Sequence, residues 1–271
     1  MPEISVITIV RNGGKFIRDA VESVLQQSFR DFEYIIIDDG SEDDTLEIIK
    51  SYNDNRIVAL SLPHDYIGNL NYALKIAKGK FIARFDGDDY MHSNRLMIQY
   101  TRMTQNPDID ICTSWGATIN DEKDFTPVYS SLTSRYVYNP LIALIRDNFI
   151  IHGSVMISSR FLKETGCKYR WEYPFCEDYD LWFQMADKKA VFYVESQVLV
   201  GIRKHSGQIT SQKNNIIRES SRQLRLKNLQ NVLIEKGMVK LADGIMESFN
   251  MTLTKGMNID EFFRFFCNLI K

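Results

Sequence analysis

The chain has 271 residues, a formal net charge of −2 at pH 7 and a hydrophobic fraction of 44%. This composition supports a substantial buried core and excludes a disordered chain. The near-neutral charge argues against nucleic acid as a partner, because no general basic field is present.

The four cysteines are scattered and include no CxxC pair, which predicts reduced thiols rather than a disulfide framework or a zinc site. The sequence begins without a basic segment and apolar run of the signal-peptide kind, and no apolar stretch is long enough to cross a bilayer. We therefore expect a cytoplasmic protein that is soluble or peripheral at the inner face of the cell membrane.

Predicted strands and helices alternate through the first ninety residues. Apolar, often β-branched runs predict strands over 4–10, 33–37, 56–62 and 81–85. Helical spacing predicts helices over 15–27 and 69–78, with Gly79 as the residue that ends the second. Between them, Ser41 and Asp44 resemble a capping box that opens a further helix. This alternation indicates βαβ units and therefore a mostly parallel sheet with helices on both faces.

Polar residues gather where these strands end. Thr8 to Arg11, the pair Asp38 and Asp39, and the run from Asp86 to Asp89 each close one predicted strand. In open α/β sheets, ligands bind beyond the carboxyl ends of the strands. We therefore expect all three strand ends to face one crevice.

The acidic run Asp86-Gly87-Asp88-Asp89 is the strongest candidate within that crevice. Asp86 and Asp88 project the same way if strand geometry continues, and two such carboxylates repel each other unless a cation joins them. Mg²⁺ or Mn²⁺ suits this oxygen pair, together with phosphate oxygens. The alternative is a solvated turn, since Asp and Gly are turn formers.

The second half of the chain is less regular. We expect a helix over 93–105, a strand over 110–115, a short helix opened by Asn139-Pro140, a strand over 154–157, and two late strands over 191–194 and 197–202. Glu177 and Asp178 begin another predicted helix. They either stabilise its N-terminus through the dipole or supply a general base.

The histidines differ in their context. His205 follows the last strand beside two cations, so it is either an ordinary surface group or a metal ligand, and the cations could meet phosphate. His64, His92 and His152 have no comparable neighbours in the sequence, and we interpret them as structural.

Taken in order, these motifs resemble the inverting glycosyltransferases of family 2, which have the GT-A fold. The resemblance covers roughly residues 4 to 211. It depends on residues 5–8, 37–41, 68–71, 82–89, 177–182 and 203–205 in this order and spacing.

The resemblance implies a role for each matching position. Thr8, with Val10 and Arg11 of the segment after it, and Asp39 would hold the nucleobase of a nucleotide-sugar, usually uracil. Arg84 would lie near the donor phosphates, Asp86 near the ribose or the metal, and Asp88 and His205 would bind Mn²⁺ or Mg²⁺. Asp178 would be the catalytic base, and Glu177 would shape the acceptor pocket.

It also implies an activity. A hexosyl or N-acetylhexosaminyl group would pass by single displacement from the donor, a UDP-sugar, to a hydroxyl of a glycan or lipid-linked acceptor, in bacterial surface polysaccharide synthesis. The sequence departs from many relatives after its first strand, where Thr8-Ile9-Val10-Arg11-Asn12 replaces Pro-Thr-Tyr-Asn, and Gly87 replaces the commoner Ala or Ser.

The predicted organisation is a GT-A domain over 1–212, with a nucleotide-sugar half (1–110) and an acceptor half (111–212), followed by a helical extension over 213–271. The extension carries an apolar stripe (Leu226, Leu229, Leu233) and a predicted cap at Asn258. Docking on the catalytic domain or on a second subunit is one interpretation, and contact with an anionic membrane is the other.

Two other functions are compatible with parts of the pattern. Acidic residues after two strands also occur in phosphoacceptor signalling modules, but that interpretation leaves the Glu177-Asp178 and His205 motifs unused. A catalytically silent nucleotide-sugar-binding protein would use the same fold.

Overall fold

The computed structural model describes residues 1–119, 125–128, 136–254 and 258–270. The chain forms two compact units whose segments alternate along the sequence. The first holds Met1–Val137, Ile150–Tyr169 and Ala190–His205, and the second holds Tyr138–Phe149, Arg170–Lys189 and Ser206–Lys271. The ranges expected from the sequence, 1–212 and 213–271, divide the chain by expected function, whereas the two compact units are defined by contacts between residues. The expected ranges therefore stay a prediction.

The first unit is built on one mixed sheet, ordered β3-β2-β1-β4-β8-β6-β9-β5, with β7 paired to β6. Its strands are β1 (Ile4–Val10), β2 (Phe32–Asp39), β3 (Ile57–Leu62), β4 (Phe81–Arg84), β5 (Tyr90–Met91), β6 (Ile111–Ile119), β7 (Phe125–Val128), β8 (Met156–Ser158) and β9 (Phe192–Arg203). The first four run parallel, whereas β8 is antiparallel to both β4 and β6.

The register of the parallel strands brings their carboxyl ends to one edge. Val10 of β1 lies opposite Asp38 of β2, and Ile7 lies opposite Arg84 of β4. This confirms the predicted parallel arrangement of the first ninety residues, and it places the polar residues that follow β1, β2 and β4 next to one another.

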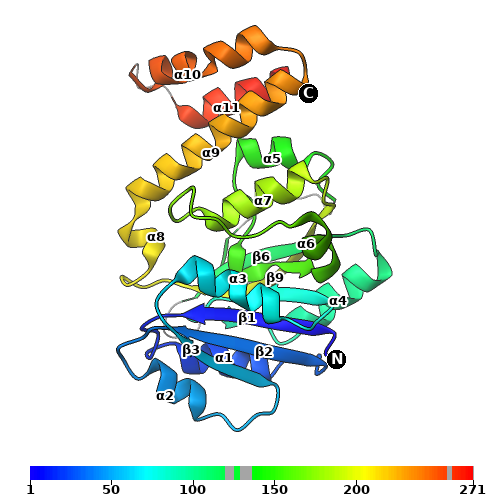
Figure 1. Cartoon of the computed structure of the whole chain (residues 1–271), viewed down its shortest axis with the longest axis vertical. Coiled ribbons are helices and arrows are strands. Elements are labelled where there is room, and N and C mark those ends of the chain that lie inside the picture. The colour runs from blue at the N-terminus through cyan, green and yellow to red at the C-terminus, as the bar shows by residue number, and fades with distance from the viewer. Residues whose placement is uncertain (120–124, 129–135, 255–257, 271) are drawn as a thin grey trace. The chain divides into compact units, whose positions relative to one another are not determined.

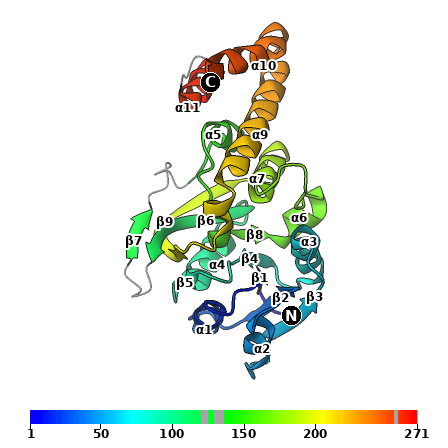
Figure 2. The same cartoon turned by 90° about the vertical axis from the view of Figure 1, so that its left-hand side faces the viewer.

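Helices cover both faces of this sheet. They are α1 (Ile17–Leu25), α2 (Thr45–Lys50), α3 (Tyr66–Ile76), α4 (Arg95–Gln105) and α6 (Ser159–Thr165). The apolar faces of α1 and α4 share one core with alternate residues of β1 and β2, while α3 contacts the same two strands. Figure 2 shows α1 and α3 on opposite sides of the sheet. Burial on both faces explains why β1 and β2 are apolar along most of their length.

Several local predictions are wrong. The two late strands are one strand, β9, with a register shift where it pairs with β6 near Trp115. The helix predicted over 69–78 is α3, which starts at Tyr66 because the Asp65 side chain accepts a hydrogen bond from the Gly68 N–H. The Ser41 hydroxyl does not cap α2, because it accepts instead from the N–H of Asn12 at 2.9 Å.

Gly79 has a different role from the one predicted. Helix α3 ends at Ile76, and Gly79 is not among the glycines with positive φ. Its N–H donates to the Ser5 hydroxyl at 2.8 Å, and a Cβ at this position would lie 2.4 Å from the backbone nitrogen of Ser5. Glycine is needed here because two backbone segments approach closely.

The second unit is helical. It holds α5 (Pro140–Arg146), α7 (Glu177–Asp187), α8 (Ile209–Gln212), α9 (Asn214–Glu235), α10 (Val239–Thr254) and α11 (Ile259–Leu269). Helix α5 contacts α7, α9 and α11, and Figure 1 shows α10 and α11 side by side near the end of α9. The predicted apolar stripe of α9 is buried here, and Asn258 caps α11 as predicted, by accepting from the Asp260 N–H.

Arg225 joins three of these helices. Its guanidinium donates to the carbonyl oxygens of Ile145 and Arg146 at 2.8 and 2.6 Å, pairs with Asp260 at 3.0 Å, and lies 3.9 Å above the Phe263 ring. These contacts satisfy the carbonyls that α5 leaves open at its C-terminus. No helix in the described part of the chain combines the length and the apolar character that a membrane span requires.

Candidate active site

Three carboxylates follow β4 and form the centre of the candidate site. Asp86 pairs with the buried guanidinium of Arg84 at 2.8 Å. Asp88 is about one-third exposed, whereas Asp89 is buried and accepts a hydrogen bond from the backbone N–H of Arg203 at 3.0 Å. The acidic run is therefore fixed on one side by β4 and on the other by the end of β9.

The crowding of these carboxylates changes their pKa values. Burial and the charge of Asp86 raise the pKa of Asp88, and burial with both neighbouring carboxylates raises the pKa of Asp89 well above its usual value. Burial also acts to raise the pKa of Asp86, but the charges and the hydrogen bond of the nearby basic side chains, Arg84 first among them, together outweigh burial, and the pKa of Asp86 is lowered. A divalent cation beside this cluster would relieve the repulsion.

His205 lies against Asp88. Its Nε2 is 3.0 Å from Asp88 Oδ2, and its ring packs on Phe16 of the segment before α1 at 4.4 Å between centroids. The structure therefore brings together Asp86, Asp88 and His205, which the sequence suggested as metal ligands.

The donor set fits a metal that also binds phosphate. Within residues 1–119, 125–128, 136–254 and 258–270, no three His, Cys, Asp or Glu side chains are arranged to hold an ion by themselves. Mg²⁺ typically takes only one or two carboxylates and completes its shell with water and phosphate oxygens. Gly153 keeps space beside the cluster, since a Cβ there would lie 2.7 Å from Asp86 Oδ2.

The residues suggested for the nucleobase have different environments. Thr8 is fully buried, and its hydroxyl donates to the Phe85 carbonyl at 2.9 Å, so it fixes β1 to the start of the acidic run. Arg11 is exposed and lies 3.5 Å from Glu42. Val10 is buried and occupies the space that a side chain at position 87 would need, because a Cβ on Gly87 would lie 3.0 Å from it. The two departures from the family pattern, Val10 at the end of the first strand and Gly87 in the acidic run, thus fit together: Val10 fills the space that Gly87 leaves open.

Asp39 is the last residue of β2 and is almost completely buried. Three hydrogen-bond donors surround its carboxylate. Its Oδ1 accepts from the Asp65 N–H at 2.8 Å and from Asn69 Nδ2 at 2.5 Å, and its Oδ2 lies 2.7 Å from His64 Nδ1. His64 was interpreted as structural because it has no neighbours in the sequence that suggest a site. Its contact with Asp39 depends on the pairing of β2 with β3, which sequence spacing does not reveal.

One further residue of the site was not anticipated, and another has a different role from the one suggested. His152 lies close enough to the acidic run to interact electrostatically with Arg84 and Asp86. Its Nε2 is within hydrogen-bonding distance of the Tyr169 hydroxyl, at 2.8 Å. Burial and the Arg84 cation lower the pKa of His152 to about 3, so the ring is neutral. Arg203, suggested as a phosphate contact, is instead buried and pairs with Asp19 at 2.9 Å.

Glu177 and Asp178 open α7 in the second compact unit, and both are partly exposed. Asp178 Oδ1 accepts from the N–H of Tyr179 at 2.7 Å, which is the arrangement expected for an acid at a helix N-terminus. The third acid of this turn, Asp180, is buried and paired with Arg170 through two bonds of 2.7 and 2.5 Å. Asp180 is therefore held inside the fold by Arg170.

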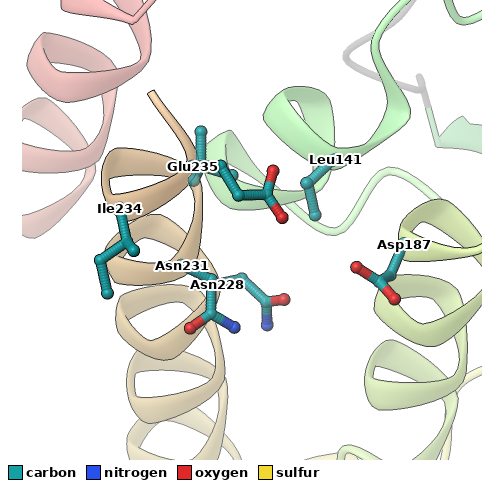
Figure 3. Close-up of a pocket in the computed structure, with 7 residues that line it drawn as sticks. Leu141, Asp187, Asn228, Asn231, Ile234 and Glu235 are labelled. Atoms are coloured by element: carbon teal, nitrogen blue, oxygen red, sulfur yellow. The ribbon is translucent and has the colours of Figure 1, made fainter. Parts of the chain in front are cut away.

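The second unit also contains a cavity of about 260 Å³ between α5, α7 and α9. Figure 3 shows Asn228 of α9 facing Asp187 of α7, with Leu141 of α5 near Glu235. No residue suggested as a site residue by the sequence lines it. This cavity is therefore a separate feature from the carboxylates that follow β4.

Comparisons with known proteins agree with the fold and the motifs. The chain is 31% identical over 230 residues to the Escherichia coli protein named UDP-Glc:alpha-D-GlcNAc-diphosphoundecaprenol beta-1,3-glucosyltransferase WfaP, which covers 82% of this chain and 85% of the relative. It is 29% identical over 222 residues to an uncharacterized glycosyltransferase of Rickettsia typhi, covering 80% of this chain and 69% of that one.

Solved structures share the fold at lower identity. Residues 1–349 of S. aureus TarS, in complex with UDP-GlcNAc, match with a TM-score of 0.67 and 23% identity over 85% of this chain and 67% of that chain. The mannosyltransferase PcManGT of Pyrobaculum calidifontis, in complex with GDP-Man and Mn²⁺, matches with a TM-score of 0.60 and 14% identity over 86% of this chain and 64% of that chain. The predicted GT-A fold with a helical C-terminal part is thereby confirmed.

A family model described as "Glycosyl transferase family 2" matches residues 5–166, which is more than half of the 271 residues. The chain therefore belongs to glycosyl transferase family 2.

Proposed function

We propose that this glycosyltransferase moves a sugar from a UDP-sugar to a hydroxyl of a lipid-linked saccharide, with inversion and with a divalent metal. One observation carries the proposal: Asp86, Asp88 and Asp89 crowd together at the carboxyl end of β4, with His205 on Asp88. The E. coli relative is named for a UDP-Glc donor and a GlcNAc-diphosphoundecaprenol acceptor, and it aligns over most of both chains. Family membership sets aside the phosphoacceptor alternative.

The residues of the first unit would bind and orient the donor. Asp39 would bind the nucleobase, with Thr8, Val10 and Arg11 forming the adjoining strand end, and Asp86 would lie near the ribose. The Arg84 guanidinium keeps its charge at any working pH: burial acts to lower its pKa, but Asp86, Tyr66 and Tyr169 together more than offset burial and raise it. A Mn²⁺ or Mg²⁺ ion held by Asp88, Asp86 and His205 would supply Lewis-acid stabilisation of the departing diphosphate.

The acids that open α7 would serve the acceptor. Asp178 would take the proton of the acceptor hydroxyl as that oxygen attacks the anomeric carbon, and Glu177 would shape the pocket around it. The dipole of α7 favours the ionised form of a carboxylate at this position. Because the acceptor oxygen attacks the anomeric carbon directly, no covalent intermediate with the enzyme would form. This single displacement would invert the configuration at the anomeric carbon.

The test separates donor binding from chemistry. Asp88→Asn should abolish Mn²⁺-dependent binding of UDP in calorimetry. Asp178→Asn should leave that binding intact and lower kcat for transfer from a UDP-sugar to lipid-linked GlcNAc by about 10²–10⁴-fold. Asp187→Asn, an exposed acid at the other end of α7, is the matched control and should keep full turnover.

Unchanged UDP affinity in Asp88→Asn would contradict the metal platform, and normal turnover in Asp178→Asn would exclude it as the base. Tight UDP binding without release of nucleoside diphosphate, across a panel of UDP-sugars and acceptors, would instead favour a silent nucleotide-sugar-binding protein.

A further inference from the structure

The buried carboxylate of Asp39 is held by three donors from one short stretch of chain. The Asp65 N–H and Asn69 Nδ2 both bond Oδ1, at 2.8 and 2.5 Å, whereas His64 Nδ1 is 2.7 Å from Oδ2. All three donors belong to the segment that leaves β3 and enters α3. This stretch therefore fixes the plane of the carboxylate.

The number of acceptor positions limits what Asp39 can still bind. An ionised carboxylate offers about four lone-pair positions, two on each oxygen. Oδ1 already accepts two hydrogen bonds and Oδ2 accepts one. One acceptor position is left, on Oδ2, beside the imidazole of His64.

The contact also fixes the protonation pattern of His64. An ionised carboxylate only accepts, so Nδ1 of His64 must donate, and Nε2 is the acceptor in the neutral ring. The His64 side chain is 53% exposed, although its carboxylate partner is only 2% exposed. The ring thus extends from the buried carboxylate to the surface where a ligand could arrive.

The turn after β2 keeps His64 in this place. Gly40 has a φ of +70°, and a Cβ at Gly40 would lie 3.1 Å from the backbone nitrogen of His64. The left-handed conformation and the close approach both favour glycine here. The backbone of His64 is consequently held against the end of β2, independently of its hydrogen bond.

We infer that His64 is a positioning residue for the nucleobase of the donor, an inference that rests on the proposed function. By holding Oδ2, it directs the single remaining acceptor position of Asp39 toward one ring N–H of the base. Uracil presents one such N–H, at N3. Guanine presents two adjacent donors, at N1 and the 2-amino group, and would need acceptor positions on both oxygens. The arrangement therefore selects uracil over guanine.

The experiment measures binding and turnover with the full chain. We compare UDP, 3-methyl-UDP (which lacks the N3–H) and GDP, each with Mn²⁺, on wild type, His64→Ala, His64→Asn and the exposed control His92→Ala. His64→Ala should weaken UDP binding about tenfold, the usual scale for a hydrogen bond to a charged group. The KM for the UDP-sugar should rise by the same factor with kcat nearly unchanged.

Two comparisons separate positioning from general damage. His64→Asn should recover most of the UDP affinity, because its Nδ2 takes nearly the place of the imidazole Nδ1. Wild type and His64→Ala should bind 3-methyl-UDP equally weakly, since that base has no N–H for Asp39 to accept, and GDP should bind wild type more weakly than UDP. His92→Ala should match wild type throughout.

Equal weakening of UDP and 3-methyl-UDP by His64→Ala would overturn the inference, as would a fall in kcat at constant KM. If wild type binds UDP and His64→Ala binds UDP with the same affinity, this inference alone is overturned. Wild type that binds no UDP would overturn the donor proposal and this inference together.

Discussion

At the scale of single residues, Arg203 links the acidic run to helix α1. Its Nε donates to the Asp88 carbonyl at 3.0 Å, and its terminal nitrogen pairs with Asp19 of α1 at 2.9 Å. Its guanidinium also lies 5.2 Å from the Phe16 ring, on which His205 packs. The side chain therefore supports Asp88 and His205, two of the three groups proposed to hold the metal, without needing to touch the metal itself.

Replacing Arg203 should consequently be costly. Arg203→Met keeps the length of the stem but leaves the Asp88 carbonyl and Asp19 without their donor, so we expect a loss of about 2 kcal/mol in the free energy of unfolding. Urea denaturation followed by tryptophan fluorescence measures it. The control is Arg222→Met, which breaks a longer pair with Glu219 (3.8 Å) on the surface of α9 and should cost less than about 0.5 kcal/mol. Equal losses in both variants would contradict the role of Arg203.

The cysteines give a second prediction at this scale. All four are buried and none forms a disulfide, and burial raises the pKa of both Cys112 and Cys176 to about 12. Because the thiolate is the reactive form, the folded protein should react very slowly with Ellman's reagent at about pH 8. The same protein in concentrated guanidinium chloride should react fully. Rapid reaction of a thiol in the folded protein would show that at least one of the four cysteines is more accessible than its burial indicates.

At the scale of elements, the contact of Gly79 with β1 predicts two opposite effects of the same substitution. Gly79→Ala would place a methyl group 2.4 Å from the Ser5 nitrogen and 2.6 Å from the Ile4 carbonyl carbon, so β1 must shift, and we expect a loss of about 2 kcal/mol. Gly244→Ala, inside α10 with nothing near the new Cβ, should instead gain up to about 1 kcal/mol from helix propensity. Thermal unfolding of both variants checks the signs, and a stabilised Gly79→Ala would refute the close approach.

The same elements show what the sequence could predict. Apolar runs and helical spacing were enough to locate β1 to β4 and the helices between them, and the pattern is strongest in β1 and β2, which are buried on both faces. The break at 195–196 that suggested two strands is a polar part of β9, in which Glu195 is buried and Ser196 is exposed, and a register shift there keeps the strand continuous. The contacts of His64 with Asp39 and of Arg203 with Asp19 could not be predicted, because each joins residues that only strand order brings together.

At the scale of the whole molecule, the chain passes several times between the two compact units. Helices α5 and α7 come from the middle of the sequence, yet they pack with α9, and α5 also packs with α11, all in the second unit. The apolar face of α9 carries Leu226, Leu229 and Leu233, all nearly fully buried. The predicted range 1–212 would therefore retain α5 and α7 but lose the helices that cover them.

Truncation tests whether that range can fold alone. Each buried leucine contributes about 1.5–3 kcal/mol by its burial, and a whole domain is stable by only about 5–15 kcal/mol. A chain ended at Gln212 should therefore have a much lower Tm and should bind the dye ANS through the uncovered faces of α5 and α7. A chain ended at Gly237 keeps α9 and loses only α10 and α11, so it should unfold cooperatively with a smaller decrease in Tm. If the shorter chain melts at the wild-type temperature without binding dye, the stability of α5 and α7 does not depend on α9, and 1–212 is a domain in its own right.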